Sequence, residues 1–348
     1  MLYQIYFKTN LKNNHAGSKA VDDLNVIANK KKFCNLIFVN HNLKNKYVNK
    51  IASCFSALIK CCKYYCEMEK NSVLLVQYPL NSSSEILNLF IKSIKKNRNV
   101  KIITLVHDVR ELLFGGIKKY NNELLDMVGY TDIIIVHNKS MLNWFINNKG
   151  VSEEKLVDLQ IFDYLSEGPI TRPQFERTVT IAGNLSKEKA GYIYKLNSIE
   201  NVTFFLYGPN YVGSSEKNVN YCGSVSPDIL PSKLNKGFGL VWDGTSLDKC
   251  DGRIGEYLKY NNPHKLSLYI SSGLPVFIWD KAAEAEFVIQ NKIGFAISQI
   301  EDIDKIINTI TEEMYFDIVK NVEKIGLLIR NGYYENEAID TALERLSK

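Results

Sequence analysis

The chain has 348 residues, of which 45% are hydrophobic and 23% are charged, and this composition is typical of a soluble globular protein. The length exceeds a single ordinary hydrophobic core, so we expect two domains. Its 43 basic and 38 acidic residues leave a net charge of +5. That balance argues against a nucleic-acid-binding protein but suits anionic nucleotides or a weak contact with a membrane surface.

Short β-rich runs alternate with amphipathic helical segments in the first half of the chain. Such alternation predicts parallel sheets built from right-handed crossovers. After an opening run at 2–7, the expected strands are 36–39, 73–77, 102–106 and 133–136, and the expected helices are 19–31, 48–69, 84–96 and 139–148.

The alternation stops at residues 163–178, which contain two prolines and a glycine and show no clear period. This composition predicts a linker between domains. Strands are expected again at 178–182, 202–207, 239–242, 275–279 and 294–297, with helices between them. The chain is therefore predicted to form two α/β domains.

The cysteines and the beginning of the chain bear on its compartment. Seven cysteines include Cys61, Cys62 and Cys66 on one expected helix, and no histidine lies near them in the sequence, so we expect free thiols rather than a zinc site. The first residues resemble a strand rather than a secretory signal, and no apolar run reaches the ~20 residues that span a bilayer. We expect a cytoplasmic protein.

Residues 261–278 carry the most informative local pattern. Pro263 begins an expected helix whose first turn contains His264 and Lys265. Cations at a helix N-terminus oppose the helix dipole, which attracts anions. A bound diphosphate would explain the arrangement, because diphosphates bind at helix N-termini. The alternative is a pair of ordinary surface cations.

Turns after the other strands of the second half carry polar, aromatic or basic residues. In open α/β sheets ligands bind beyond the carboxyl ends of the strands, so these turns are expected to meet. With Pro263, His264 and Lys265 they predict a nucleotide-diphosphate site formed by Gly183, Asn184, Lys187, Tyr207, Gly208, Ser224 and Asp243. The chain has neither the dinucleotide fingerprint G-x-G-x-x-G nor a P-loop.

The stretch Y-L-K-Y-N-N-P-H-K-L-S-L-Y-I-S-S-G-L-P-V at 257–276 resembles the donor-site segment of one group of GT-B glycosyltransferases. That group contains the glucosyltransferase 3 of streptococcal serine-rich adhesins and bacterial galactofuranosyltransferases. Shorter matching pieces occur in the same order along nearly the whole chain, among them H-A-G-S-K-A at 15–20, V-Q-Y-P at 76–79, L-V-H-D-V at 105–109, I-A-G-N-L-S-K at 181–187 and L-Y-G-P at 206–209.

The resemblance implies a GT-B fold of two facing Rossmann-like domains. We expect an acceptor-binding domain at 1–162, a linker at 163–178, a nucleotide-sugar-binding domain at 179–330 and a C-terminal helix at 331–348 that crosses back to the first domain. The resemblance also implies a homo-oligomer and a reaction without cofactor or metal, and the chain shows no D-x-D motif in a convincing loop.

Under this resemblance the first domain should hold the acceptor and the catalytic base. Gly17, Ser18 and Lys19 follow the first strand, and Gln77 and Tyr78 end the third, with Tyr78 placed to stack on a sugar. Ser18 could instead be a helix cap. Asp108 at the end of the next strand is the first candidate for the base, alongside His107, His15 and Asp22. Its alternatives are to cap a helix or to pair with Arg110.

The predicted function is transfer of a hexose, glucose or galactofuranose, from a UDP-sugar to a sugar hydroxyl of a glycan or glycoprotein. Single displacement with inversion and without metal is expected. The alternative is a non-catalytic GT-B-shaped partner of another glycosyltransferase. Lys187, His264 and Lys265 argue against it, because an empty phosphate pocket has no need of cations.

Overall fold

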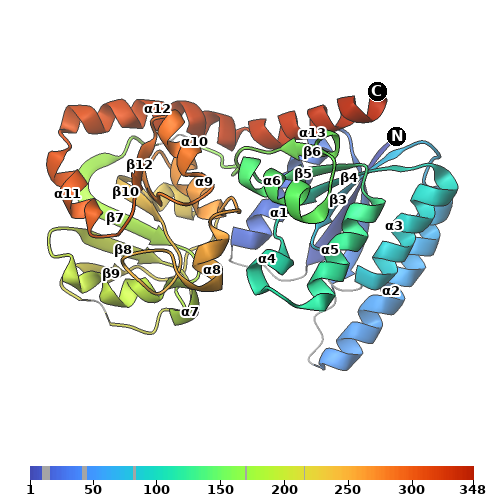
Figure 1. Cartoon of the computed structure of the whole chain (residues 1–348), viewed down its shortest axis with the longest axis horizontal. Coiled ribbons are helices and arrows are strands. Elements are labelled where there is room, and N and C mark those ends of the chain that lie inside the picture. Colours follow the sequence, from blue (N-terminus) through green and yellow to red (C-terminus); the bar gives the residue numbers. More distant parts are fainter. Residues whose placement is uncertain (10–15, 41–44, 81–83, 169–170, 215) are drawn as a thin grey trace.

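The computed structural model describes the chain except for residues 10–15, 41–44, 81–83, 169–170 and 215. Two α/β domains lie side by side, and both chain ends are on the N-terminal domain (Figure 1). Among the described residues, no helix combines the length and the apolar character needed to cross a membrane.

The N-terminal domain has one parallel sheet in the order β2-β1-β3-β4-β5-β6. Its central strands are apolar along their whole length rather than alternating, because helices cover both faces of a parallel sheet. The strands are β1 Leu2–Thr9, β2 Cys34–Asn40, β3 Val73–Tyr78, β4 Lys101–Val106, β5 Ile133–Val136 and β6 Leu156–Asp158. The helices are α1 Ala16–Lys30, α2 Lys46–Glu67, α3 Ser84–Arg98, α4 Arg110–Phe114, α5 Lys118–Tyr130 and α6 Lys139–Lys149, with a 3₁₀ helix at Glu153–Lys155.

The C-terminal domain has a second parallel sheet in the order β12-β11-β10-β7-β8-β9. The chain order reverses between β10 and β7, and open α/β sheets bind ligands at such a point. The strands are β7 Gln174–Ala182, β8 Thr203–Tyr207, β9 Val219–Tyr221, β10 Lys236–Val241, β11 Val276–Trp279 and β12 Gly294–Ile297. The helices are α7 Lys187–Ala190, α8 Gly252–Tyr257, α9 His264–Ser271, α10 Ala285–Gln290, α11 Asp302–Thr309 and α12 Glu312–Arg330, with 3₁₀ helices at Gly191–Ser198 and Leu230–Lys233.

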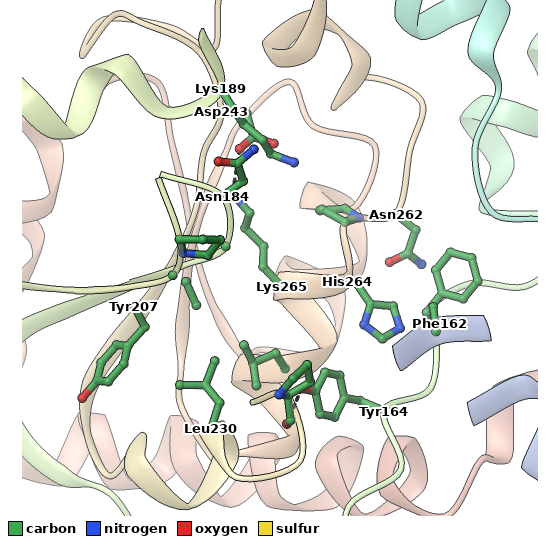
Figure 2. Close-up of a pocket in the computed structure, with 18 of the residues that line it drawn as sticks. Phe162, Tyr164, Asn184, Lys189, Tyr207, Leu230, Asp243, Asn262, His264 and Lys265 are labelled. Carbon is green, nitrogen blue, oxygen red and sulfur yellow. Dashed lines mark hydrogen bonds and ion pairs between the residues drawn. The ribbon is translucent and has the colours of Figure 1, made fainter. Parts of the chain in front are cut away.

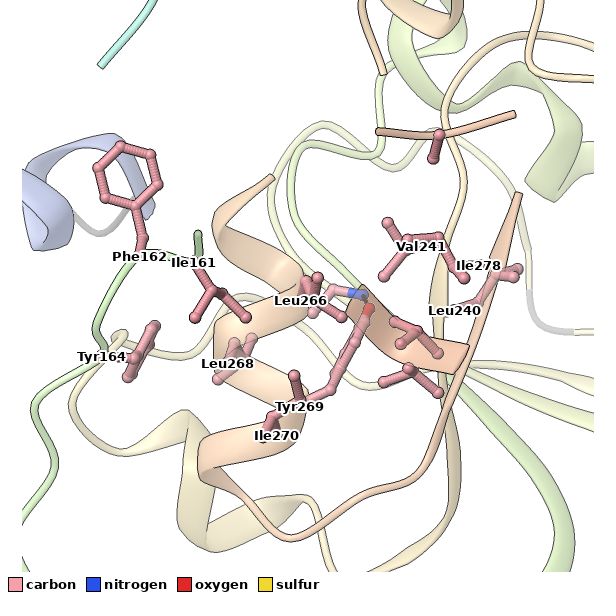
Figure 3. Packing of buried hydrophobic residues seen from close by; sticks show 14 of the residues in the cluster. Ile161, Phe162, Tyr164, Leu240, Val241, Leu266, Leu268, Tyr269, Ile270 and Ile278 are labelled. Atoms are coloured by element: carbon pink, nitrogen blue, oxygen red, sulfur yellow. Dashed lines mark hydrogen bonds between the residues drawn. The ribbon is translucent and has the colours of Figure 1, made fainter. Parts of the chain in front are cut away.

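Helix α9 is fixed against the sheet by Tyr269 (Figure 3). The ring lies against Gly239 of β10, where an added Cβ would be 2.2 Å from the ring atom Cγ. Its hydroxyl accepts a hydrogen bond of 2.8 Å from the backbone N–H of Ala182, at the end of β7. A single buried side chain therefore sets the position of the α9 N-terminus relative to two strand ends.

The last helix, α13 (Tyr333–Ser347), returns to the N-terminal domain as expected (Figure 1). Arg345 donates hydrogen bonds to the carbonyls of Glu154 (3.1 Å) and Leu156 (2.7 Å), and Lys31 pairs with Asp340 at 2.6 Å. The fold thus matches the predicted architecture. One local difference concerns the expected linker, because β7 already begins at Gln174 and pairs there with Lys236 of β10.

Candidate active site

A cavity of about 370 Å³ lies between the domains, beyond the carboxyl ends of β7, β8 and β10. Side chains from several C-terminal-domain turns and from the segment that joins the domains surround it (Figure 2). Of the residues predicted to bind the donor, the cavity is lined by Gly183, Asn184, Tyr207, Gly208, Ser224, Asp243, Pro263, His264 and Lys265. The N-terminal domain contributes Ala20, His107 and Asp108.

Two of the strand-end turns are in direct backbone contact. Gly208 has φ of 149°, and a Cβ at this position would lie 1.7 Å from the carbonyl oxygen of Gly183. Only glycine allows these turns to approach so closely. Both glycines line the cavity at the ends of β7 and β8.

The structure does not place Lys187 in the cavity. Its side chain is exposed, and Nζ lies 5.4 Å from the centre of the Tyr194 ring. Lys189 lines the cavity instead, and among the described residues its side chain makes no ion pair. Both residues are on α7, where positions two apart point about 200° away from each other. The predicted turn therefore borders the cavity, but the lysine that lines the cavity is Lys189 and not the predicted Lys187.

Lys265 reaches the cavity, but its charge is already paired. Nζ lies 2.7 Å from Oδ1 of Asp243 and 3.0 Å from the carbonyl oxygen of Trp242. The two side chains are only 11% and 5% exposed. The pair joins α9 to the end of β10, so the expectation of Lys265 as a free cation for diphosphate needs correction.

His264 is neutral, contrary to its expected role as a cation. Burial, with smaller effects from His107 and Lys19, lowers its pKa to about 3. Both ring nitrogens are buried without a hydrogen-bond partner in the described structure. Its ring lies beside Tyr164, with 5.3 Å between ring centres, and Phe162, with 5.8 Å. The site therefore offers an uncharged imidazole with one donor and one acceptor.

Two asparagines that sequence reasoning missed line the same cavity. The side-chain oxygens Oδ1 of Asn261 and Asn262 are buried and have no partner among the described residues. Asn262 is held by its own N–H, which donates to Nδ1 of His137 at 2.9 Å, and by Nδ2, which donates to the Gln160 carbonyl at 3.2 Å. Buried polar atoms normally have partners, so unpaired ones in a cavity indicate a place for a polar ligand.

The N-terminus of α9 begins beside these residues. Pro263 is its N-cap and provides no side-chain hydrogen bond to the first turn. The first N–H groups of a helix have no partner within the helix and carry its positive dipole end. An anion in the cavity would find these groups and the Lys189 ammonium.

A second cavity, of about 340 Å³, lies in the N-terminal domain and shares His107 and Asp108 with the first. Its other lining residues are mainly apolar: Ile5, Phe7, Val21, Gln77, Pro79, Arg110, Leu113 and Phe114. Asp108 thus lies at the junction of the two cavities. This is where a base would contact an acceptor hydroxyl that approaches a donor from the opposite domain.

Neither alternative role of Asp108 occurs in the structure. The N-cap of α4 is Val109, with no side-chain cap, and Arg110 pairs with Glu123 at 3.2 Å. The Asp108 side chain is accessible, yet protein surrounds it on most sides, and this burial raises its pKa. Lys189 opposes that rise. A raised pKa brings a carboxylate closer to the range useful for a general base.

His107 forms a wall of the cavity. Its Nε2 lies 2.7 Å from Oε1 of Gln77, which can only accept, so this nitrogen carries the proton. Its ring stacks on Phe162 with 5.6 Å between centres, and burial lowers its pKa to about 4. His107 is therefore neutral and oriented by Gln77.

The other predicted acceptor-side residues are placed differently from expectation. Tyr78 is 2% exposed, so its ring is part of the core and cannot stack on a sugar. Lys19 holds the joining segment: its Nζ bonds to Asp23 (2.7 Å) and to the Leu165 carbonyl (2.8 Å). Gly17 and Ser18 fall in the first turn of α1, Asp22 does not line either cavity, and His15 lies outside the described residues.

Two facing, doubly wound domains with a cavity between them define the GT-B class of glycosyltransferases. Sucrose-phosphate synthase from Thermosynechococcus elongatus shares this fold, with a TM-score of 0.66 and 10% identity over 100% of this chain and 99% of that chain. The Anabaena protein HepE in complex with UDP also shares it, with a TM-score of 0.60 and 13% identity over 99% and 100% of the two chains.

The sequence comparison identifies the family. Residues 3–161 match the glucosyltransferase 3-like N-terminal domain, and residues 179–342 match the glucosyltransferase 3-like C-terminal domain. The chain belongs to the glucosyltransferase 3-like family. It is 35% identical over 344 residues to the beta-1,6-galactofuranosyltransferase WbbI of Escherichia coli, and the alignment covers 97% of each chain. It is 29% identical to glucosyltransferase 3 of Streptococcus gordonii, over 79% of this chain and 80% of that protein. The predicted family and enzyme class, a glycosyltransferase, are confirmed.

Proposed function

We propose that the protein transfers a glucosyl or galactofuranosyl group from a UDP-sugar to a sugar hydroxyl of a glycan or glycoprotein, with inversion at the transferred carbon. The bond from that carbon to the UDP oxygen breaks as the bond to the acceptor oxygen forms. Asp108 takes the acceptor proton, and UDP leaves. The position of Asp108 between the two cavities is the observation on which this proposal depends.

The donor fits the first cavity in three parts. The turns at Gly183 and Gly208, with Tyr207, would hold the uridine, and the α9 N-terminus and Lys189 would hold the diphosphate. Asn261, Asn262 and His264 supply unpaired polar atoms for sugar hydroxyls. The HepE structures with UDP and with UDP-glucose support a UDP-sugar donor.

The second cavity suits the acceptor. Its apolar and aromatic lining matches the C–H face of a sugar ring, while Gln77 and Arg110 supply polar contacts. A base on the N-terminal side and diphosphate-binding groups on the C-terminal side stand on opposite sides of the transferred sugar. That arrangement favours a single displacement with inversion.

No metal is expected in the proposed reaction, because Lys189 and the α9 N-terminus would neutralise the leaving diphosphate. The family and the fold are also compatible with the alternative, a non-catalytic partner of another glycosyltransferase. However, buried polar atoms without partners cost stability unless a ligand satisfies them, so the cavity favours a protein that binds its donor.

The cellular setting is also a proposal. None of the seven cysteines, all of them in the described part of the chain, forms a disulfide, which supports a reducing cytoplasm. A homo-oligomer is expected from the family resemblance. The net charge of +5 suits a weak peripheral contact with an anionic membrane surface.

A nucleotide-sugar screen tests the donor. The purified protein is heated with UDP, UDP-glucose, UDP-galactofuranose and the corresponding ADP compounds, and slow hydrolysis of each sugar donor is followed. We expect UDP compounds to stabilise the fold by about 2.7 kcal/mol at a hundredfold excess over Kd. Equal stabilisation by the ADP compounds, or none by UDP, would contradict the proposed donor.

A further inference from the structure

Tyr257, the last residue of α8, joins the two domains next to Asp108. Helix α8 belongs to the C-terminal domain and lies against α4 of the N-terminal domain (Figure 1). The Tyr257 hydroxyl accepts a hydrogen bond of 2.8 Å from the backbone N–H of Val109. Val109 directly follows Asp108 and is fully buried. The C-terminal domain therefore holds the backbone beside the proposed base.

The proton of the same hydroxyl faces the Asp108 carboxylate. A phenol can both accept and donate, so the bond from Val109 leaves the O–H group of Tyr257 for a second bond. That bond goes to Asp108, and among the described residues no other side chain donates a hydrogen bond to this carboxylate. Burial and the charge of Asp108 raise the pKa of Tyr257 well above its usual range, so the hydroxyl keeps its proton.

The position of Tyr257 is set by close packing inside its own domain. Gly255 lies against the turn after β10, where an added Cβ would be 2.9 Å from the carbonyl oxygen of Asp243. Asp251, the N-cap of α8, accepts a hydrogen bond of 2.8 Å from the Thr245 hydroxyl. Tyr257 itself is 4% exposed. Such packing leaves its hydroxyl little freedom to move away from the domain boundary.

The backbone of Tyr257 connects to the first cavity. Its carbonyl accepts a hydrogen bond of 3.0 Å from the N–H of Asn261, whose side-chain oxygen is one of the unpaired atoms at that cavity. Tyr257 lines neither cavity. Its effect on the reaction therefore passes through Asp108 rather than through contact with a substrate.

We propose that Tyr257 is a positioning residue of the transfer reaction: its hydroxyl orients the Asp108 carboxylate, and it does so only while the two domains are closed on each other. The proposal rests on the proposed role of Asp108 as the base. Separation of the domains would break the bonds to Asp108 and Val109 together, because both start from one oxygen atom. The base is thus oriented when the domain that holds the donor meets the domain that holds the acceptor.

The same bond affects the pH at which the base ionises. The charged groups that face Asp108 are Lys189 on α7 and Arg110 on α4. The neighbouring His107 is neutral. Burial raises the pKa of Asp108, and Lys189 and the Tyr257 hydroxyl oppose this rise. A hydrogen bond donated to a carboxylate favours its ionised form, so loss of the hydroxyl should raise the pKa of Asp108 further.

The variant Tyr257→Phe tests the proposal, because it removes the hydroxyl and keeps the ring. We expect kcat, measured as UDP release with added acceptor, to fall roughly 10- to 100-fold. The acidic limb of the pH profile of kcat should move upward by about one pH unit. The Kd for UDP should stay the same, which also shows that the variant is folded. The matched control Tyr260→Phe makes the same change at a position that lines neither cavity, and it should alter neither kcat nor the limb.

Two further variants separate orientation of the base from a general loosening of the domains. Arg253→Ala removes another bond between α8 and the N-terminal domain, the one of 3.0 Å to the Phe114 carbonyl, and should leave the acidic limb in place. In the Asp108→Asn background, Tyr257→Phe should lower kcat by no more than about twofold, because no carboxylate remains to be oriented.

The outcomes distinguish this proposal from the assignment of the base. If Asp108→Asn is impaired but Tyr257→Phe has the wild-type kcat and an unmoved limb, Asp108 remains the base and the positioning role is overturned. An equal loss from Tyr257→Phe in both backgrounds overturns it as well, because the hydroxyl would then act through the fold alone. A near-normal kcat in Asp108→Asn contradicts the proposed base, and the positioning role of Tyr257 falls with it.

Discussion

At the scale of single residues, Asp108 is the most consequential assignment. Asp108→Asn retains the shape and removes the basicity, so turnover should fall by about 10²–10⁴ while UDP affinity stays the same. Measured kcat and the Kd for UDP together check this. A variant with near-normal kcat would exclude Asp108 as the base, and His107 would be the next candidate.

The pH dependence of the wild type has a defined sign. Burial raises the pKa of Asp108, and the base must be ionised, so kcat should rise with pH through a value above the ordinary carboxyl range. Protonation at lower pH removes activity. The residual activity of Asp108→Asn should lack this acidic limb, and an identical limb in the variant would assign it to another group.

Lys189 and Lys187 form a matched pair, two positions apart on α7. Lys189→Ala should weaken UDP binding by about 1.5–3 kcal/mol, because it removes a charge-assisted contact to the diphosphate. Lys187→Ala should leave the affinity unchanged, since its side chain lies on Tyr194 outside the cavity. Titration calorimetry compares the two. Equal losses in both variants would mean that α7 acts through its overall charge rather than through one side chain.

The two lysines also show how far the sequence can locate this site. The sequence predicts that basic residues follow β7, because a turn with glycine and lysine after an apolar run can be recognised from residue types alone. Which lysine faces the cavity depends on the residue at which α7 begins. Helix ends cannot be assigned from a sequence pattern to within one or two residues, so the pattern does not distinguish the two lysines. The pairing of Lys265 with Asp243 was also hidden, because only the fold brings together residues 22 positions apart.

At the scale of elements, two buried carboxyl groups meet at the start of α13, Glu335 from the helix itself and Asp163 from the segment that joins the domains. Asp163 accepts hydrogen bonds from the N–H groups of Tyr334 (3.3 Å) and Glu335 (2.6 Å). Burial raises the pKa of Asp163 to about 8, and burial together with Asp163 raises that of Glu335 well above its usual range. Both Glu335 oxygens lack a partner among the described residues. The folded chain therefore holds protons that the unfolded chain releases.

This arrangement predicts a stability that falls as pH rises. The stabilising effect of the raised pKa is fully present below about pH 4, the unfolded value, and is lost as pH rises toward 8. The slope should approach about 1.4 kcal/mol per pH unit for each retained proton. Glu335→Gln should flatten it in urea unfolding at pH 5–8. Glu337→Gln, at an exposed position of the same helix, serves as the control, and an unchanged slope in Glu335→Gln would contradict the assignment.

The elements also show why some boundaries were predictable. The strands at 133–136 and 294–297 occur with the predicted limits. The first is a short apolar run between polar residues that is buried along its whole length, which is the pattern of a strand covered on both faces. The beginning of β7 was missed. Its first four residues are exposed or partly buried and, apart from Phe175, polar, so they lack a clear apolar signal and are held by pairing with β10.

At the scale of the whole molecule, several hydrogen bonds join the domains around the cavity. Tyr257 of the C-terminal domain accepts a bond of 2.8 Å from the Val109 N–H, directly after Asp108. Asn138 donates to Glu284 at 2.8 Å, and Arg253 donates to the Phe114 carbonyl at 3.0 Å. The sequence predicted two facing domains, but their contacts depend on single polar side chains that carry no local pattern. These bonds set how closely Asp108 faces the donor cavity.

The proposal that the reaction needs no metal belongs to the same scale, because it depends on groups from several elements acting on one diphosphate. The Lys189 ammonium and the N–H groups at the start of α9 are expected to neutralise the charge that develops on UDP. Turnover should therefore be retained in excess EDTA, measured as UDP release with added acceptor. Lys189→Ala should lower turnover in the presence and absence of EDTA alike. Complete loss of wild-type turnover in EDTA, restored by Mg²⁺ or Mn²⁺, would show that a metal ion neutralises the leaving diphosphate. The assignment of that role to Lys189 and the N-terminus of α9 would then be wrong.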